Sequence, residues 1–493
     1  MRPTPTIVFS PGVFRGKSVH FRTGHVIIKV YSQDASERAV RSVLDEVMGK
    51  ISFQIVGKSV GRWSYLSLNT DTDILTLVEH LKGDKRVQYV EPDLKMTGSA
   101  EVRDPGDPLL YDDESPQQWG IGRINLFDVW KTQRGNDSVL IGLIDSGLQL
   151  KTENEDNLTL HDSLTDIIDH IDFDGSRFIT GNNFLYEPPK PWPHEDPDYS
   201  YVHGTNMAGI LAAWENNTDE NGDFIGIAGV NWRSPVYISV AIDSGNNSTI
   251  GLVFLATYEI LSFAADTDGK PNVVINLSAN YVDIPLEDSS APGPPGQPVL
   301  IEDPPPSGDP DVPGDSEGPV IPADPMDTMN EMFGMIVEAG AIICISSGKG
   351  SLDPDGTLIQ HPAKLGVETE IYASHVIAVG AIDREWKIYE HSGRGIDDMV
   401  FAPGVNVGTT DKNNGWGLED GASIATAHVS GLASLLWSED PTLTAAKVVR
   451  AIKETCQFPP EAESGSNAES EFLSLGVVDA KAALQKVRDW GSS

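Results

Sequence analysis

Short runs that are almost entirely apolar recur along most of the chain, and stretches of helical periodicity, such as residues 205–214 and 250–265, separate them. The apolar runs are residues 139–144, 236–241, 273–277, 341–345 and 376–381. Runs of this kind are typical of parallel strands that are buried on both faces of a sheet. The alternation therefore predicts an α/β domain of three layers, in which helices cover both faces of a mostly parallel central sheet.

A smaller pattern precedes this domain, in residues 26–99. Strand-like stretches and two amphipathic helices, the second ended by Gly83, follow one another in the order β-α-β-β-α-β. The strands are expected at residues 26–30, 51–56, 64–68 and 86–93, and the helices after Ser36 and at residues 74–81. This order predicts a small ferredoxin-like α+β domain, with residues 1–25 as an N-terminal arm.

Residues 282–325 interrupt the α/β pattern. They hold 13 prolines and 10 acidic residues, and neither Lys nor Arg. Such a composition is incompatible with a helix or a central strand, so we expect an extended, solvated insertion. It is either a surface excursion or a loop that shields the site it follows.

The charge of the chain excludes one class of partner. Acidic residues number 73 and basic residues 35, which gives a net charge of −38. A surface of this sign repels phosphate backbones, so nucleic acid is not an expected partner. The two cysteines, Cys344 and Cys456, cannot form a disulfide framework.

The sequence shows neither a secretory signal nor a membrane span. Residues 1–23 contain prolines and basic residues and lack an uninterrupted apolar core. No stretch approaches the roughly 20 apolar residues that a spanning helix needs. Three expectations for localisation follow: the protein is cytoplasmic, it is exported by a route other than the general secretory one, or its sequence is given without a leader.

Three short segments supply the groups that activate a serine nucleophile. Asp145 ends an apolar run, where the carboxyl end of a parallel strand lies at the ligand side of the sheet. His203 opens a helical pattern, with Gly204 next to it. Ser423 follows a glycine and an alanine at the start of another helical run. A carboxylate, an imidazole and a hydroxyl in these settings predict nucleophilic catalysis.

Each residue also has a structural interpretation. Asp145 fits a cap of the following turn, and Ser423 fits an ordinary helix N-cap. His361 and His428 are alternatives for the base. We prefer His203 because a helix start leaves its ring accessible, whereas His428 is expected to pack inside the helix after Ser423.

Taken together, the motifs resemble the subtilisin-like serine proteases, the subtilase family. The resemblance rests on Ile-Asp145-Ser-Gly, His203-Gly-Thr-Asn-Met-Ala-Gly and Gly-Ala-Ser423-Ile-Ala, in that order. It implies a subtilisin-like domain over residues 100–493 that hydrolyses polypeptide substrates through an acyl-enzyme, without a catalytic cofactor. A transpeptidase is a narrower alternative, although no amine site is evident.

The resemblance also extends to the smaller domain. Residues 87–93, Val-Gln-Tyr-Val-Glu-Pro-Asp, are similar to the end of the propeptide that precedes subtilisin-type enzymes. Residues 26–99 would then be an inhibitor-like propeptide, which makes the chain a zymogen and the propeptide an intramolecular partner. Self-processing is expected near Ser99–Ala100.

By the same resemblance, we expect substrate to pair as an added strand with one short segment and to enter a pocket walled by another. The first segment is Ser278, Ala279 and Asn280, and the second is Ser346, Ser347 and Gly348. Gln360 would lie near the floor of that pocket.

Lys349 departs from the family pattern, which has Asn at this position to donate to the oxyanion. In subtilisin, loss of that donor costs about 10²–10³ in turnover. An ammonium is a charged donor but is flexible and strongly hydrated. We expect an active enzyme with reduced turnover; the alternative is an impaired scaffold that acts as a binding or regulatory protein.

A structural calcium ion is a further expectation. Asp107 matches a position that binds calcium in some relatives, and residues 215–223 are rich in hard oxygen ligands. An acidic turn explains this loop equally well.

Overall fold

The computed structural model describes residues 7–14, 17–30, 40–44, 53–56, 63–68, 73–82, 84–98, 118–151, 158–165, 168, 170, 172–193, 195, 202–214, 226–280, 327–348, 359–459 and 475–491. The chain divides into two units. The larger unit comprises Met1–Ile7, Lys95–Val282 and Glu331–Ser493, and the smaller comprises Val8–Leu94 and Asp283–Asn330.

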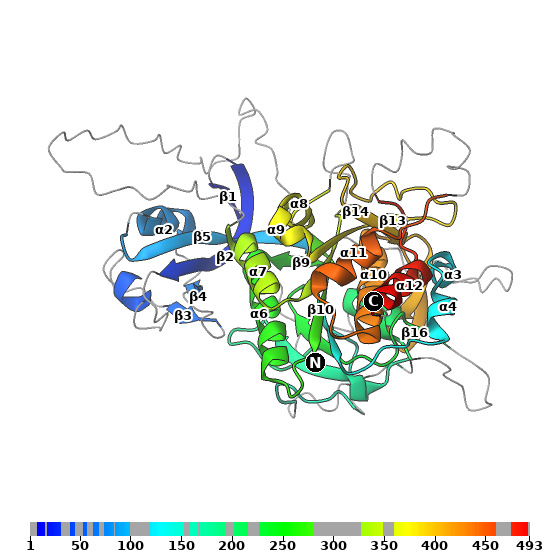
Figure 1. Ribbon diagram of the computed structural model, residues 1–493. Helices are drawn as coiled ribbons and strands as arrows, with labels where there is room; N and C mark the ends of the chain where they lie inside the picture. Colours follow the sequence, from blue (N-terminus) through cyan, green and yellow to red (C-terminus); the bar gives the residue numbers. More distant parts are fainter. Residues whose placement is uncertain are drawn as a thin grey trace. The chain divides into compact units, whose positions relative to one another are not determined.

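A parallel sheet forms the centre of the larger unit (Figure 1). Its strand order is β14-β13-β12-β10-β6-β8-β7, and every neighbouring pair is parallel. The strands are β6 (Val139–Asp145), β7 (Phe178–Asn183), β8 (Val236–Val240), β10 (Asn272–Leu277), β12 (Ile342–Ser346), β13 (Val376–Ile382) and β14 (Met399–Pro403). The prediction of a parallel sheet built from the apolar runs is confirmed.

Helices cover both faces of this sheet, as predicted. On one face, Ser430 of α10 (Ala422–Glu439) donates to Asn276 of β10 at 2.8 Å. On the other, Ile260 of α6 (Ile250–Asp266) lies directly over Gly142 of β6, where a Cβ would approach it to 2.8 Å. Because Asn276 pairs with Leu143, next to Gly142, the two helices lie on opposite faces.

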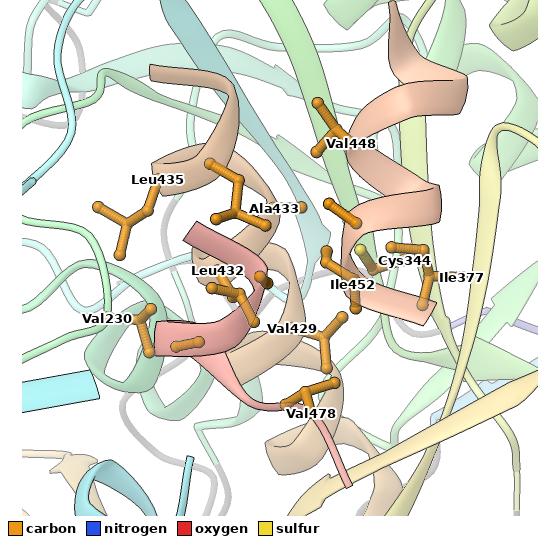
Figure 2. Close-up of a cluster of buried hydrophobic side chains, with 14 of the residues drawn as sticks. Val230, Cys344, Ile377, Val429, Leu432, Ala433, Leu435, Val448, Ile452 and Val478 are labelled. Atoms are coloured by element: carbon orange, nitrogen blue, oxygen red, sulfur yellow. The ribbon is translucent and has the colours of Figure 1, made fainter. Parts of the chain in front are cut away.

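The core on the α10 face joins elements that are distant in the sequence. α10, α11 (Ala445–Lys453) and α12 (Ala480–Gly491), orange to red in Figure 1, pack against one another. Figure 2 shows Val429 and Leu432 of α10 among side chains from β12, β13 and α11. Burial of this apolar face, at about 25 cal/mol per Å², is what fixes the start of α10 relative to the strand ends.

Shorter elements complete the larger unit. The remaining helices are α3 (Trp119–Arg123), α4 (Leu126–Trp130), the 3₁₀ turn Gly175–Arg177, α5 (His203–Ala212), α8 (Ala363–Glu368) and α9 (Glu370–Ala373). Short strands are β9 (Asn247–Thr249), β11 (Ala279–Asn280) and the hairpin β15 (Val407–Asp411) with β16 (Gly415–Glu419). Helix α7 (Asp327–Glu338) contributes residues to both units.

The smaller unit has the strand order of a ferredoxin-like sheet. Its strands β2 (Lys17–Val30), β3 (Phe53–Ile55), β4 (Trp63–Leu68) and the first part of β5 (Val87–Gly98) are antiparallel in the order β5-β2-β4-β3. Helix α2 (Ile74–Lys82) follows β4, and residues 40–44 are helical. A small N-terminal α+β region is therefore confirmed.

One part of the N-terminal expectation differs from the structure. Residues 1–25 were expected to form an arm, but β1 (Phe9–Phe14) pairs with β2, which begins at Lys17 rather than near Val26.

The acidic insertion 282–325 lies outside the described residues. Among the helices of the described ranges, none is long and apolar enough to cross a membrane.

Candidate active site

Asp145 and His203 meet where β6 ends and α5 begins. Asp145 is the last residue of β6, and His203 is the first residue of α5. The His203 Nδ1–H donates to Asp145 Oδ1 at 2.6 Å, and both side chains are buried. A carboxylate accepts only, so this contact places the proton on Nδ1 and leaves Nε2 as the basic nitrogen of the neutral ring.

The charge of the neighbouring carboxylate also changes the acidity of the imidazole. Burial alone would lower the pKa of His203, but the Asp145 carboxylate and its hydrogen bond outweigh burial. The net result is a pKa raised above the ordinary value of 6.5. An imidazole with a raised pKa is a stronger base at neutral pH.

Ser423 lies in the first turn of α10. Its side chain is fully buried, and its Oγ has no hydrogen-bond partner among the described residues. Gly421 precedes the helix with a φ of 148°, a conformation that side-chain-bearing residues rarely adopt. At this helix start the backbone N–H groups and the macrodipole favour negative charge.

The elements that carry these three residues contact one another: β6 contacts both α5 and α10, and α5 packs against α10. The alternative bases do not share this setting. His428 is buried, with Nδ1 at 2.9 Å from the Ile424 carbonyl, and burial lowers its pKa to about 4. His361 is half-buried and immediately precedes the turn into α8.

The end of β5 lies between two short strands of the larger unit, β9 and β11. The end of β5 pairs antiparallel with β9, where Lys95 lies opposite Thr249 and Thr97 opposite Asn247. On its other edge it pairs antiparallel with β11, where Gly98 lies opposite Ala279. The chain is thus a strand as far as Gly98, and Ser99 and Ala100 lie outside the described residues.

Two hydrogen bonds connect expected pocket residues in pairs. Asn280 donates through Nδ2 to Ser346 Oγ at 2.8 Å, and the Gln360 N–H donates to the Ser347 carbonyl at 2.9 Å. Gly348 has a φ of 85°, and a Cβ there would lie 2.3 Å from Gln360 Oε1. Glycine is thus required where the chain passes Gln360.

The remaining predicted site residues are one buried serine and several residues outside the described ranges. Ser278 is buried beside Asn276, which donates to its Oγ at 3.4 Å. Lys349, Asp107 and the acidic loop 215–223 lie outside the described residues. Within the described ranges, no group of three or more His, Cys, Asp and Glu side chains is suited to hold a metal ion.

A family model decides the classification. The model of the Subtilase family matches residues 136–476, a range that contains Asp145, His203 and Ser423. The chain belongs to the subtilase family. It is a serine-type endopeptidase by class, a hydrolase.

Subtilisins of two Bacillus species are similar to this subtilase. Subtilisin E of Bacillus subtilis (strain 168) is 22% identical over 429 residues, which are 87% of this chain and 84% of the relative. Subtilisin DY of Bacillus licheniformis is 31% identical over 147 residues, 30% of this chain and 48% of the relative.

A solved structure shares the fold. Fervidolysin of Fervidobacterium pennivorans, described as a keratinolytic enzyme related to subtilisin, matches with a TM-score of 0.61 and 18% identity. The match covers 98% of this chain and 64% of that protein, so this subtilase spans less than two thirds of fervidolysin. At this identity the match shows that the two proteins share a fold.

Glu195 is a site residue that sequence reasoning missed. Its side chain is 3% exposed and accepts hydrogen bonds from the Gly204 N–H at 2.8 Å, from the Thr205 hydroxyl at 2.5 Å and from the Ser146 hydroxyl. Burial is the main cause that raises its pKa to about 7. In the sequence, Glu195 is one acidic residue in a polar stretch before His203, and no motif there predicts a contact with the active site.

The raised pKa of Glu195 predicts a pH-dependent stability for this subtilase. Between the ordinary value of 4.5 and about 7, the unfolded chain releases a proton that the folded protein keeps. Stability therefore falls as pH rises through this window, by about 3 kcal/mol at most. Glu195→Gln is expected to remove this fall, as measured by urea unfolding at pH 4.5 and 8 in a Ser423→Ala background that prevents self-digestion. Equal pH dependence with and without the substitution would contradict it.

Proposed function

We propose that the protein hydrolyses internal peptide bonds through an acyl-enzyme, with Ser423 as nucleophile, His203 as general base and acid, and Asp145 as the residue that orients His203. The observation that carries the proposal is the 2.6 Å contact of Asp145 and His203 on two elements that both contact the Ser423 helix. Labelling by a serine-directed fluorophosphonate tests it: one adduct on Ser423 is expected, and absence of reaction contradicts the proposal.

The chemistry follows from the protonation state of His203. Ser423 Oγ attacks the carbonyl carbon of the scissile bond while Nε2 takes the hydroxyl proton, and Asp145 stabilises the imidazolium that forms. When the tetrahedral intermediate collapses, the C–N bond breaks and the same proton passes to the leaving amine. Water, activated by the same imidazole, then hydrolyses the acyl-enzyme.

The oxyanion of the tetrahedral intermediate requires donors. The backbone N–H of Ser423 is one candidate, because it belongs to the first turn of α10. We assign the second donor position to Lys349, which follows Ser347 and Gly348 in the sequence. Its ammonium is charged but poorly preorganised, so turnover below that of an Asn-bearing relative is expected.

Lys349→Asn tests this assignment. If the lysine is a poor donor, a short amide at this position raises kcat, by up to about 10²-fold, with little change in KM. The measurement is steady-state hydrolysis of a fluorogenic peptide, with Lys364→Asn as a control for the loss of one lysine charge. A fall in kcat would show that the ammonium is itself the working donor.

Self-processing is the second part of the proposal. The end of β5 occupies, between β9 and β11, the position in which a substrate strand would pair. Because the described strand ends at Gly98, directly before Ser99, this pairing supports a cleavage near Ser99–Ala100. The released N-terminal segment would then bind as a product-like inhibitor through the same strand.

Lys349 also favours a second candidate function. If neither backbone nor lysine stabilises the oxyanion, the fold would serve as a binding or regulatory scaffold that keeps its N-terminal segment. Such a scaffold would pair with extended peptides at β11 without cleaving them. Peptide binding without a fluorophosphonate adduct would identify this case.

Calcium at Asp107 or in the loop 215–223 remains a proposal from the sequence. Hard oxygen ligands of this kind suit calcium, which would stabilise the fold and take no part in the chemistry.

A further inference from the structure

Glu195 connects the two segments that carry Asp145 and His203. Two backbone hydrogen bonds hold Glu195 beside the segment after β6. The Glu195 N–H donates to the Leu148 carbonyl at 2.8 Å, and the Leu148 N–H donates to the Pro193 carbonyl at 2.8 Å. The side chain then reaches α5, where Oε1 accepts from Gly204 N–H at 2.8 Å and Oε2 from Thr205 Oγ1 at 2.5 Å. Glu195 thus ties the segment after β6 to the first turn of α5.

The same carboxylate reaches the end of β6 through Ser146. The Ser146 hydroxyl donates to Glu195, and it accepts the Gly204 N–H at 2.9 Å. The Ser146 backbone N–H donates to Asp145 Oδ1 at 2.8 Å, and Asp145 Oδ1 is the atom that receives His203 Nδ1–H. One buried network therefore runs from Glu195 through Ser146 to the Asp145–His203 pair.

The packing around this network leaves little space for other arrangements. A Cβ on Gly204 would lie 2.1 Å from the Gly147 carbonyl oxygen, and one on Gly147 would lie 2.6 Å from the Pro193 carbonyl oxygen. The turn after Asp145 and the start of α5 thus approach as closely as glycine permits. The Glu195 carboxylate therefore bonds to two backbone segments that already lie in close contact at Gly147 and Gly204.

We propose that Glu195 is a positioning residue of the active site, which holds His203 in register with Asp145 by bridging Ser146 and the first turn of α5. The proposal rests on the proposed function, because it assigns Glu195 a part in the same reaction. Glu195 touches neither substrate nor the reacting atoms. It acts through the orientation of the imidazole, where small displacements have large effects on rate.

The charged groups around Glu195 support this role. Asp145 of β6 raises the pKa of Glu195, and Glu195 in turn raises that of His203, as does Glu419 of β16. Above about pH 7, where Glu195 is ionised, its charge therefore stabilises the imidazolium that forms during catalysis. Its removal is expected to shift the acid limb of the pH–kcat profile to lower pH, an effect that a residue with a purely structural role would not have.

Glu195→Ala, Glu195→Gln and the control Glu259→Ala test the proposal. Glu259 lies on α6, with its carboxylate bonded to Asn182 and Ser239, and its pKa is also raised to about 7. Glu195→Ala is expected to lower kcat by about 10- to 100-fold with KM nearly unchanged. Glu195→Gln, which still accepts from Gly204, should restore most of the rate. Glu259→Ala should lose thermal stability but keep its kcat.

Two results would overturn the proposal: an unchanged kcat and pH profile in Glu195→Ala, or an equal loss of kcat in Glu259→Ala. A readout without turnover separates this failure from failure of the proposed function. In a Ser423→Ala background, the low-field proton NMR signal of His203 Nδ1–H, assigned by its loss in His203→Asn, should shift or broaden with Glu195→Ala. It should persist with Glu195→Gln and Glu259→Ala. A signal unaffected by Glu195→Ala would overturn the positioning role whether or not the protein cleaves peptides.

Discussion

Ser423→Ala is expected to lower kcat for peptide hydrolysis by about 10⁶-fold, the loss known for the nucleophile of the related subtilisin. The physical reason is that Oγ supplies the only attacking atom of the proposed mechanism, so without it the acyl-enzyme cannot form. Ser423 is fully buried at the start of α10, and alanine fits the same space without a new contact. We therefore expect the variant to fold normally.

Ser438→Ala is a matched control for this prediction. Ser438 is buried near the other end of the same helix, where its hydroxyl bonds the Ser434 carbonyl at 2.8 Å. Its loss should leave kcat unchanged. Burst kinetics with an activated ester measure both variants, and only Ser423→Ala should lose the burst. Retention of wild-type turnover in Ser423→Ala would exclude this residue as the nucleophile.

Asp145→Asn is the second substitution with a large expected effect, a loss of about 10⁴ in kcat. The carboxylate accepts the Nδ1 proton of His203 at 2.6 Å, whereas an amide turned toward the ring would donate to Nδ1. The proton would then move to Nε2, the nitrogen that must accept the proton from Ser423. The substitution changes the tautomer and not the volume, so stability should fall far less than rate.

A pH profile adds an independent check on Asp145. Against the effect of burial, the Asp145 carboxylate contributes most to raising the pKa of His203. Without its charge, the acid limb of kcat/KM should move from above pH 6.5 to lower pH. Asp479→Asn, which removes a carboxylate bonded to Asn125 and to the N–H of Ala482, is the control. An unchanged limb in Asp145→Asn would show that this contact does not govern His203.

The central sheet could be predicted from the sequence because its strands are buried on both faces. Every residue of β6 and β13 is buried, and a continuous apolar run is the direct result. The positions of Asp145, His203 and Ser423 at element boundaries could be predicted because each lies within two residues of a glycine, which is a local pattern.

Other elements gave no comparable pattern. In β15, Thr409 and Thr410 are buried although they are polar, because their hydroxyls donate to the Asn206 and Thr205 carbonyls of α5 at 2.5 and 2.6 Å. β1 contains a proline and a glycine and alternates only weakly. The buried threonines of β15 are stabilised by partners far away in the sequence, which periodicity cannot reveal.

The role of Glu195 at the active site also could not be predicted from the sequence. A buried carboxylate is tolerated only with several donors, and those donors come from Ser146, Gly204 and Thr205 on two other segments. The spacing between Glu195 and His203 carries no periodic signal. Residues of this kind become visible only when the chain is folded.

The intact mass of the freshly purified protein, beside that of Ser423→Ala, tests the central claim most directly. The account predicts that the wild type loses its N-terminal segment and yields a chain beginning near Ala100, while Ser423→Ala keeps all 493 residues. Two chains of equal, unprocessed length, with no fluorophosphonate adduct on the wild type, would contradict a self-processing serine endopeptidase.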